Sequence, residues 1–202
     1  MSTGFDETYA AEQIRRRLSP LRRLVKAQYL ARLASELDGP TIDLGCGAGQ
    51  LLERLPHGSI GLEFNDALIR YLEEIRLPVL KYDALADDFA LTPLRTRSPG
   101  SYEHLVCSHV LEHFDDAAGV LRKLTASAAA LGLRGMTFVV PGLKGFRRDP
   151  THRTFITEAF IRSQGLDQLA PFRLTRVAYF PGNWRRLGEI FDYHECILTW
   201  RH

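Results

Sequence analysis

The sequence predicts an α/β fold: a doubly wound sheet of seven mostly parallel strands with helices on both faces, preceded by an N-terminal helical extension. Three observations predict it. The chain has 202 residues, 45% of them hydrophobic and 25% charged, which fits one domain of ordinary composition. From residue 39 onward, short apolar runs rich in β-branched residues alternate with amphipathic stretches. A glycine-rich turn directly follows the first of these runs.

The helical extension is expected to occupy residues 1–38. Residues 6–18 are polar and favour a helix, and Ser19 and Pro20 interrupt it. Apolar residues then recur at helical spacing until the next glycine and proline end the pattern. We expect this extension to act as a lid or as one wall of a binding site.

The strands follow the extension, and the last two are expected to close as an antiparallel hairpin. They are predicted at 41–45, 59–64, 78–82, 104–110, 135–140, 172–180 and 194–200.

Helical patterns fall between most of these strands. Asn65 and Asp115 have the residue types of helix N-caps, and a loop rich in glycine and arginine is expected over 142–153. The predicted helices are 49–55, 66–76, 116–130 and 157–164.

Charge and cysteine content limit the classes of function. Lys plus Arg number 26 and Asp plus Glu 24, so a net charge of +2 does not favour a dedicated nucleic-acid or membrane-surface binder. No apolar run approaches the roughly 18 to 20 residues of a membrane span, and the start has no apolar signal-peptide core. Cys46, Cys107 and Cys196 form no Cys-x-x-Cys pair, so neither a disulfide framework nor a thiolate zinc site is expected. We therefore expect a cytoplasmic protein.

The segment TIDLGCGAGQ, residues 41–50, carries the most information about a ligand. Its glycines allow a sharp turn after a buried strand and let a flat ligand lie close to the backbone, although a tight turn without a ligand would look the same. Glu63 ends the next strand, 20 residues after Asp43, where a carboxylate can accept both hydroxyls of a ribose. A nicotinamide dinucleotide is disfavoured, because Gln50 stands where G-x-G-x-x-G requires Gly or Ala.

The residues DLGCGAG, with Glu63 after the second strand and Asp83 after the third, closely resemble class I S-adenosylmethionine-dependent methyltransferases. The resemblance covers about residues 41–145 and implies a Rossmann-like fold with strand order 3-2-1-4-5-7-6. It also implies S-adenosylmethionine as the cofactor. A carboxylate such as Asp43 suits that cation, whereas it would repel a pyrophosphate.

The resemblance implies a role for each strand tip. Asp43 would face the methionine amino group, Glu63 the ribose, and Asp83 with the backbone of Ala84 the adenine amino group; the alternative for Asp83 is the acid of a turn before Ala84. Ser108 and His109 would lie beside the methionine portion. The full set of expected cofactor contacts is Asp43, Gly45, Cys46, Gly47, Glu63, Phe64, Asp83, Ala84, Ser108 and His109.

A histidine cluster follows the fourth strand in SHVLEHFDD, a segment that resembles a large methyltransferase group with V-L-E-H at this place. If the segment is helical, His109 and His113 share a face at the mouth of the crevice. His152 follows the fifth strand and is expected on the same rim. Glu112 and His113 could also serve only to begin a helix.

Two chemical roles for the cluster stay open. His113 or His152 could be the catalytic general base, since imidazole titrates near neutral pH; these two are our catalytic candidates, and we assign no metal ligands. Alternatively, His109, Glu112, His113 and His152 would surround a divalent metal, which resembles small-RNA 3′-end methyltransferases. That group usually has a carboxylate at the position of His109, and an imidazole-rich set suits zinc, iron or nickel better than magnesium.

The predicted acceptor side is basic. Residues 144–153 carry four positive charges against one negative, so they could grip an acidic acceptor through arginine forks or simply form a solvated face. Phe180 and Trp184 could line an acceptor pocket or pack in the core or at an edge.

Together these patterns predict one methyltransferase domain over residues 1–202, with a cofactor-binding half at 39–145 and an acceptor-side half at 146–202. It would move a methyl group from S-adenosylmethionine to an oxygen or nitrogen of a small molecule, such as a sugar, a nucleotide sugar or a secondary metabolite. Two alternatives stay open: an RNA methyltransferase with a metal-assisted His/Glu site, and a catalytically silent scaffold subunit of this fold. The arginine-rich loop leaves nucleic acid as a disfavoured but open partner.

Overall fold

The computed structural model describes residues 7–96, 100–191 and 193–202, with only the backbone described at 20–25 and 185. Residues 1–6 of the predicted extension lie outside this description. In the described part, one sheet of eight strands runs in the order β3-β2-β1-β4-β5-β8-β7-β6. The strands are β1 (Thr41–Leu44), β2 (Ile60–Glu63), β3 (Val79–Lys81), β4 (His104–Ser108), β5 (Gly135–Pro141), β6 (Gln168–Leu169), β7 (Phe172–Phe180) and β8 (Glu195–Arg201).

The predicted strand order is confirmed, since the predicted sixth and seventh strands, 172–180 and 194–200, correspond to β7 and β8. β1 to β5 are parallel to their neighbours, and β8 inserts antiparallel between β5 and β7, as the predicted hairpin requires. The predicted number of strands is wrong by one, because β6 adds a two-residue edge strand that pairs with the start of β7. Two residues are too few to produce an apolar alternation in the sequence.

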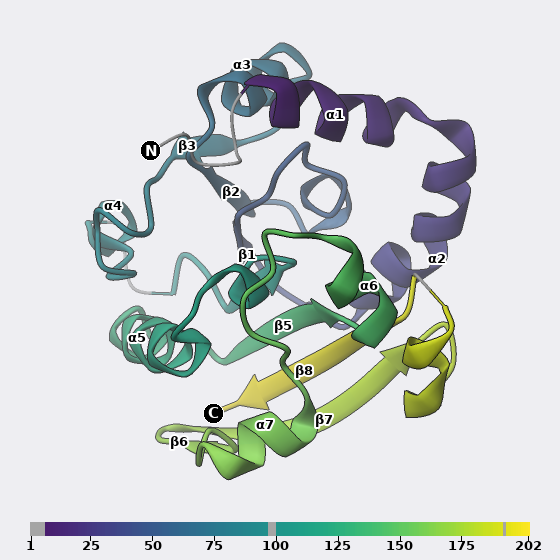
Figure 1. Ribbon diagram of the computed structural model, residues 1–202. Helices are drawn as coiled ribbons and strands as arrows, with labels where there is room; N and C mark the ends of the chain where they lie inside the picture. The colour runs from purple at the N-terminus through teal and green to yellow at the C-terminus, as the bar shows by residue number, and fades with distance from the viewer. Residues whose placement is uncertain (1–6, 97–99, 192) are drawn as a thin grey trace.

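Helices cover both faces of the sheet (Figure 1). Leu30 and Leu33 of α2 pack on one face against Val106 and Val139. Leu94 of α4, Leu121 of α5 and Ile161 of α7 lie in the core cluster of the other face. The helices are α1 (Glu7–Leu18), α2 (Pro20–Ser35), α3 (Asp66–Glu74), α4 (Thr92–Arg95), α5 (Ala117–Ala130), α6 (Leu143–Arg148) and α7 (Glu158–Ser163), with single turns η1 (Leu52–Arg54), η2 (Leu111–His113) and η3 (Arg185–Glu189).

Three local predictions need correction. The predicted helix 49–55 is a turn followed by the short η1, because Gly49 has a φ of +74° and Pro56 follows closely. The predicted loop 142–153 contains α6. The cap of α5 is Asp116, not Asp115, since the Asp116 carboxylate accepts the Gly119 amide at 2.8 Å. The other predicted cap is confirmed: Asn65 accepts the amides of the second and third residues of α3.

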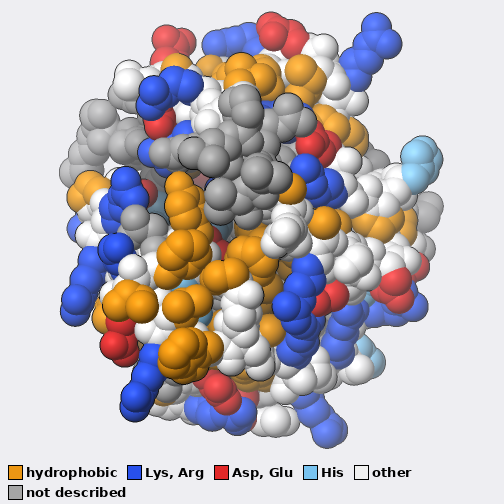
Figure 2. All heavy atoms as spheres, turned by 90° about the vertical axis from the view of Figure 1, so that its right-hand side faces the viewer, with side chains coloured by type: hydrophobic (Ala, Val, Ile, Leu, Met, Phe, Trp, Pro, Cys, Tyr) orange, Lys and Arg blue, Asp and Glu red, His pale blue; other side chains and the backbone are white. Residues whose placement is uncertain are grey.

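The connection between β7 and β8 exposes apolar side chains. Trp184 is 65% exposed and Ile190 71% exposed, so Trp184 does not pack in the core. Phe180 is partly buried, with its ring 5.7 Å from that of Tyr29. Figure 2 shows the side of the molecule that carries α2 and η3, where apolar side chains gather between lysines and arginines. Among the described residues, no helix has the length and apolar character to cross a membrane.

Candidate functional site

The glycine turn after β1 has two crowded positions, Gly45 and Gly49, and one open position, Gly47. Gly45, Gly47 and Gly49 all have positive φ values, between +54° and +74°. A Cβ on Gly45 would lie 2.5 Å from a methyl carbon of Val110, whereas a Cβ on Gly47 would meet none of the described residues within 4 Å. Position 45 therefore requires glycine both for close packing and for its backbone conformation. The backbone of Gly47 instead faces open space where a ligand can approach.

Glu63, at the tip of β2, holds this turn and its own strand end together. Its carboxylate accepts the backbone amide of Gly47 at 2.9 Å and those of Phe64 and Asn65, each also at 2.9 Å. Burial raises the pKa of Glu63, and the three N–H donors limit that rise. The acid is thus fixed in position beside the open face of Gly47.

Asp43 in β1 is a buried acid with an unused acceptor. The residue is 2% exposed, and its Oδ2 has no hydrogen-bond partner among the described residues. Burial, with the charge of Glu63 adding to it, raises the pKa of Asp43 to about 7. A buried carboxylate with an unused acceptor oxygen is suited to binding a cation.

The tips of β2 and β3 carry exposed apolar side chains. Phe64 is 43% exposed and Leu85 is 69% exposed. Asp83 is also exposed, and its Oδ1 accepts the backbone amides of Leu85 at 3.0 Å and Ala86 at 3.1 Å. Asp83 is therefore the acid of a turn, one of its two predicted roles, and Ala84 lies inside that turn.

Cys46 lies within the glycine turn but turns its side chain away from the open face. Its thiol packs with Leu52 and Leu72 and fills the space beside the backbone of Gly61. Cys107 and Cys196 are likewise buried thiols.

The end of β4 places His109 between two buried acids. Nδ1 of His109 lies 3.3 Å from Glu112 Oε1, and Nε2 lies 3.3 Å from Glu195 Oε2. Burial lowers the pKa of His109, but the charges of Glu195 and Glu112 outweigh it, so this pKa is raised above its usual value. Beside it, the hydroxyls of Ser108 and Tyr29 are hydrogen-bonded at 3.1 Å.

His109 and His113 do not share a helix face. His109 has a φ of +58°, and the helical turn η2 begins only at Leu111. A left-handed residue at this point stops any helix from running through the segment, so the expectation of a shared face is wrong.

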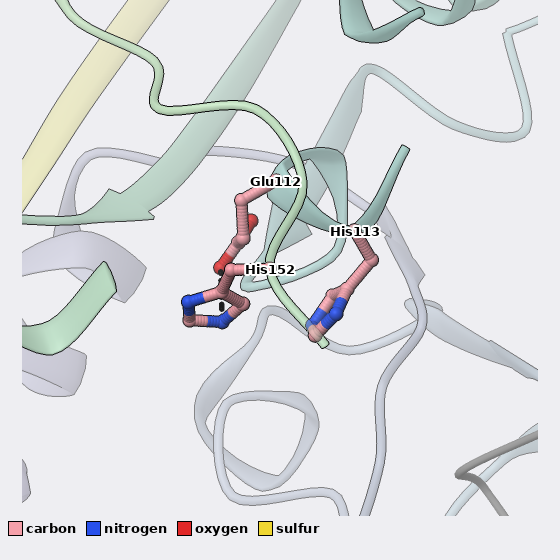
Figure 3. A group of neighbouring side chains, drawn as sticks. All are labelled: Glu112, His113 and His152. Atoms are coloured by element: carbon pink, nitrogen blue, oxygen red, sulfur yellow. Dashed lines mark ion pairs between the residues drawn. The ribbon is translucent and has the colours of Figure 1, made fainter. Parts of the chain in front are cut away.

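His113 instead meets His152, together with Glu112 (Figure 3). One donor atom from each of the three lies within 4.8 Å of the others, and the two imidazole rings are 4.8 Å apart. His152 Nε2 is 3.8 Å from Glu112 Oε1. The loop that carries His152 is fixed to η2, because the carbonyl of Glu112 accepts the amides of Arg153 and Thr154. His113 and His152 therefore lie together on one rim, as predicted. His109 lies next to this pair, on the other side of Glu112.

Each histidine of the pair is oriented through Nδ1. His152 Nδ1 lies 2.9 Å from the carbonyl oxygen of Phe146, and its ring stacks on that of Phe146. His113 Nδ1 lies 3.0 Å from Thr151 Oγ1, which donates to Asp149 Oδ1 at 2.6 Å. Since Thr151 donates to Asp149, it accepts from the Nδ1–H of His113. Nδ1 is therefore the donor nitrogen in both rings.

Sequence reasoning missed four residues of this site. Asp149 and Thr151 carry a signal, since Asp followed two residues later by Thr is typical of a side-chain turn. Glu195 and Tyr29 carry none, because they reach the site from β8 and α2 through the fold alone.

The helix α1 lies over the glycine turn and α3 (Figure 1). Its Ala10 packs with Ala48 of the turn and Leu68 of α3. Arg17 Nη1 donates to the Ala48 carbonyl at 2.5 Å, and its other Nη pairs with Glu53. Burial and the charge of Glu63 raise the pKa of Tyr9 to about 12. This helix therefore has the position that a lid over the turn would need.

Comparisons with known proteins agree with this architecture. Residues 42–130 match the family model of a methyltransferase domain. The chain is 32% identical over 107 residues to a ubiquinone biosynthesis O-methyltransferase of Ralstonia nicotianae, a match that covers 52% of this chain and 43% of that protein. The chain thus spans less than half the length of that relative.

Two solved structures share the fold over almost the whole chain. A SAM-dependent methyltransferase from Archaeoglobus fulgidus aligns with a TM-score of 0.68 at 20% identity, covering 96% of this chain and 99% of that one. The magnesium protoporphyrin IX methyltransferase of Synechocystis, with bound SAH, aligns with a TM-score of 0.61 at 17% identity, covering 98% and 96%. The fold is therefore the Rossmann-like fold of class I methyltransferases, as the sequence predicted.

Proposed function

On the premise of a methyltransferase domain over residues 42–130 within a class I methyltransferase fold, we propose that the protein transfers the methyl group of S-adenosylmethionine to an oxygen or nitrogen of a small-molecule acceptor. The observation that carries the proposal is the pairing of an open glycine turn at Gly47 with the buried Oδ2 of Asp43, which has no hydrogen-bond partner within the described ranges. A flat ligand with a cationic end satisfies both.

The residues of the cleft fit this cofactor one by one. Asp43 would receive its ammonium group, because an opposite charge offsets the cost of burying the carboxylate. Glu63 accepts one N–H at Oε2 and two at Oε1, and its remaining lone pair, on Oε2, would accept a ribose hydroxyl. Phe64 would pack against the adenine, which the turn of Asp83 and Ala84 would border. The turn backbone at Gly45, Cys46 and Gly47, with Ser108 and His109, would line the rest.

When bound, S-adenosylmethionine supplies a methyl group on a sulfonium, which is already an activated leaving group. The protein therefore needs no nucleophile of its own, and most of the rate would come from holding the acceptor atom in line and excluding water. The cover of α1 over the turn favours such exclusion.

His113 and His152 are proposed to act on the acceptor. Each has Nδ1 engaged, which leaves the Nε2 lone pair to take a proton from an acceptor hydroxyl or ammonium group. Burial, with the nearby His152 adding to it, lowers the pKa of His113, so this ring is neutral and competent as a base at neutral pH.

The acceptor is proposed to be a small molecule with an acidic group. Arg147 and Arg148 of α6 are exposed on the segment that bears Phe146, which orients His152. Guanidinium groups bind carboxylates and phosphates through paired hydrogen bonds.

The test is equilibrium binding of S-adenosylmethionine and of its demethylated product by calorimetry, followed by transfer of labelled methyl groups to a panel of hydroxy and amino metabolites. We expect Glu63→Ala to weaken cofactor binding by about 10-fold or more, because charged hydrogen bonds are lost. Asp66→Ala is the matched control, since Asp66 is an exposed acid nearby that pairs with Lys81.

Four outcomes separate the candidate functions. Binding with turnover supports the enzyme, and binding without turnover on any acceptor supports the scaffold subunit. Failure of the wild-type chain to bind either nucleoside would contradict both. Turnover of oligonucleotides with steep salt dependence would identify an RNA methyltransferase instead.

A further inference from the structure

Two buried acids at the end of the sheet that carries the glycine turn, Glu112 and Glu195, have no part in the proposed binding of the ammonium and ribose groups. Glu112 is 0% exposed and Glu195 is 7% exposed. Glu195 is the first residue of β8 and lies opposite Pro141, because β8 runs antiparallel to β5. Each acid has a buried Oε2 without a hydrogen-bond partner among the described residues. Both carboxylates therefore keep an unused acceptor at this site.

The imidazole of His109 lies between the two carboxylates. Its Nδ1 is 3.3 Å from Glu112 Oε1, and its Nε2 is 3.3 Å from Glu195 Oε2, an ion-pair contact without the geometry of a hydrogen bond. A neutral imidazole has one N–H, so its other nitrogen would turn a lone pair toward a carboxylate. With an acid on each side, the ring therefore carries two N–H groups and a positive charge.

The charges of this group do not cancel. Glu112 and Glu195 contribute two negative charges, and His109 contributes one positive charge. In the part of the chain that the structure describes, the one other basic side chain at ion-pair distance from either acid is His152, 3.8 Å from Glu112. As the proposed base, His152 is neutral. One negative charge is left over, and its burial is costly unless a cation approaches it.

This negative charge adjoins the place proposed for the methionine part of the cofactor. The hydroxyl of Tyr29 is hydrogen-bonded to Ser108 at the end of β4. Burial raises the pKa of Tyr29, and the charges of Glu195, Asp43 and Glu112 raise it further. Asp43, the proposed partner of the ammonium group, therefore lies in the same region as the other two acids.

We propose that Glu112, His109 and Glu195 form an anionic unit that favours the sulfonium of the cofactor, so that the protein binds S-adenosylmethionine more tightly than its demethylated product. Both nucleosides carry an ammonium and a carboxylate group, and they differ by one methyl group and one positive charge. A buried negative charge attracts the charged form more strongly, because little water screens it. The inference rests on the proposed function, since it concerns the same cofactor.

This preference would speed the release of the product. When the methyl group moves to the acceptor, the bond between carbon and sulfur breaks and its electron pair stays on sulfur. The acceptor gains the methyl group and gives its proton to the proposed base, so no positive charge remains on the cofactor. The demethylated nucleoside then lacks the attraction to the anionic unit, and weaker binding means faster dissociation.

The test is equilibrium binding of both nucleosides to the whole chain by calorimetry, without an acceptor. A third probe is an analogue with an ammonium group on carbon in place of the methylsulfonium, which has the charge but no methyl group to transfer. We expect the wild type to bind both charged probes at least about 10-fold more tightly than the demethylated product. Glu195→Gln and Glu112→Gln keep the size of the side chain and remove its charge. Each should bring this ratio close to one, through weaker binding of the charged probes.

Glu103→Gln is the matched control. Glu103 is an acid that pairs with Arg134, and it precedes β4 at the end opposite to His109. This variant should keep the ratio of the wild type. Circular dichroism on the same samples shows whether each variant is folded.

The wild type alone can decide against the inference, even if a variant fails to fold. Equal affinities for the charged and the neutral nucleosides, or tighter binding of the product, would overturn the inference and leave the proposed function intact. Folded glutamine variants that weaken all three probes equally would also overturn it, since a merely structural role does not depend on the charge of the ligand. Failure of the wild type to bind any of the probes would contradict the proposed function itself.

Discussion

The carboxylate of Glu63 accepts the backbone amide of Gly47 across 2.9 Å, so the tip of β2 holds the turn at the end of β1. The contact leaves the opposite face of Gly47 open, since a Cβ there would touch no atom of the part of the chain that the structure describes within 4 Å. A side chain added at Gly47 would therefore project into the space proposed for the cofactor.

Gly47→Ala should lower the affinity for the cofactor. The loss should be larger than the loss of folding stability caused by the same substitution can explain. Its φ of +54° makes any side chain unfavourable by about 1 kcal/mol. Gly132→Ala is the matched control, because Gly132 also has a positive φ, +71°, and open space for a Cβ, but follows α5. Both variants should lose similar stability in urea unfolding, and only Gly47→Ala should lose S-adenosylmethionine binding in calorimetry. Equal affinity in the two variants would argue against a cofactor at this turn.

Asp43→Asn should change how stability depends on pH. Burial raises the pKa of Asp43 to about 7, so the folded state binds a proton that the unfolded chain releases near pH 4. The contribution of Asp43 is therefore most favourable at low pH and falls as pH rises from about 4 to about 7. Relative to wild type, Asp43→Asn should gain stability between about pH 5 and about pH 8, by a few kcal/mol at most. Urea unfolding of both proteins at the two pH values measures this gain in stability. A difference in stability that does not change with pH would refute the raised pKa of Asp43.

Thr151→Val should disturb His113 without touching the cofactor. The substitution removes the hydroxyl that accepts the Nδ1–H of His113 and donates to Asp149. We expect kcat to fall by about 10-fold while KM for S-adenosylmethionine stays constant, and Thr151→Ser should restore kcat. Nitrogen NMR of the imidazole reports the tautomer directly. If Nδ1 stays protonated to the same extent in Thr151→Val, the hydroxyl does not orient this ring.

Arg17→Met should loosen α1. Arg17 joins this helix to the Ala48 carbonyl and to Glu53, whereas exposed Arg15 pairs with Glu12 of its own helix. Limited proteolysis should cut near residues 18 and 19 several-fold faster in Arg17→Met than in Arg15→Met, because local opening costs less free energy. Cofactor dissociation in stopped flow should accelerate in parallel. Similar rates in the two variants would remove α1 from the role of a lid.

The sequence was sufficient to predict seven of the strands and the residues at their tips, and the resemblance to class I methyltransferases implied the strand order. Short apolar runs mark buried parallel strands, and glycines such as Gly45 and Gly47 mark the turn that follows the first. The carboxyl ends of neighbouring parallel strands meet at one edge, so Asp43 and Glu63 could be placed together before any coordinates.

The remaining features depend on contacts between distant parts of the chain. Asp115 and Asp116 have the same residue type, and only the backbone path selects Asp116 as the cap. The left-handed conformation of His109 is fixed by its amide on the Val139 carbonyl and by acids on both sides, one of them from β8. A local sequence pattern does not indicate such distant partners, which is why the shared helix face of His109 and His113 was predicted wrongly.

The position of β8 in the sheet has a consequence during synthesis. β5 is bordered on one side by β8, a strand that emerges from the ribosome about 60 residues later, and Trp200 of β8 is 0% exposed in the core. Until β8 arrives, the nascent chain presents the edge of β5 with its backbone groups unpaired, and such an edge invites association with other chains. A chaperone that shields this edge would therefore raise the yield of native protein more than one that acts on the completed chain.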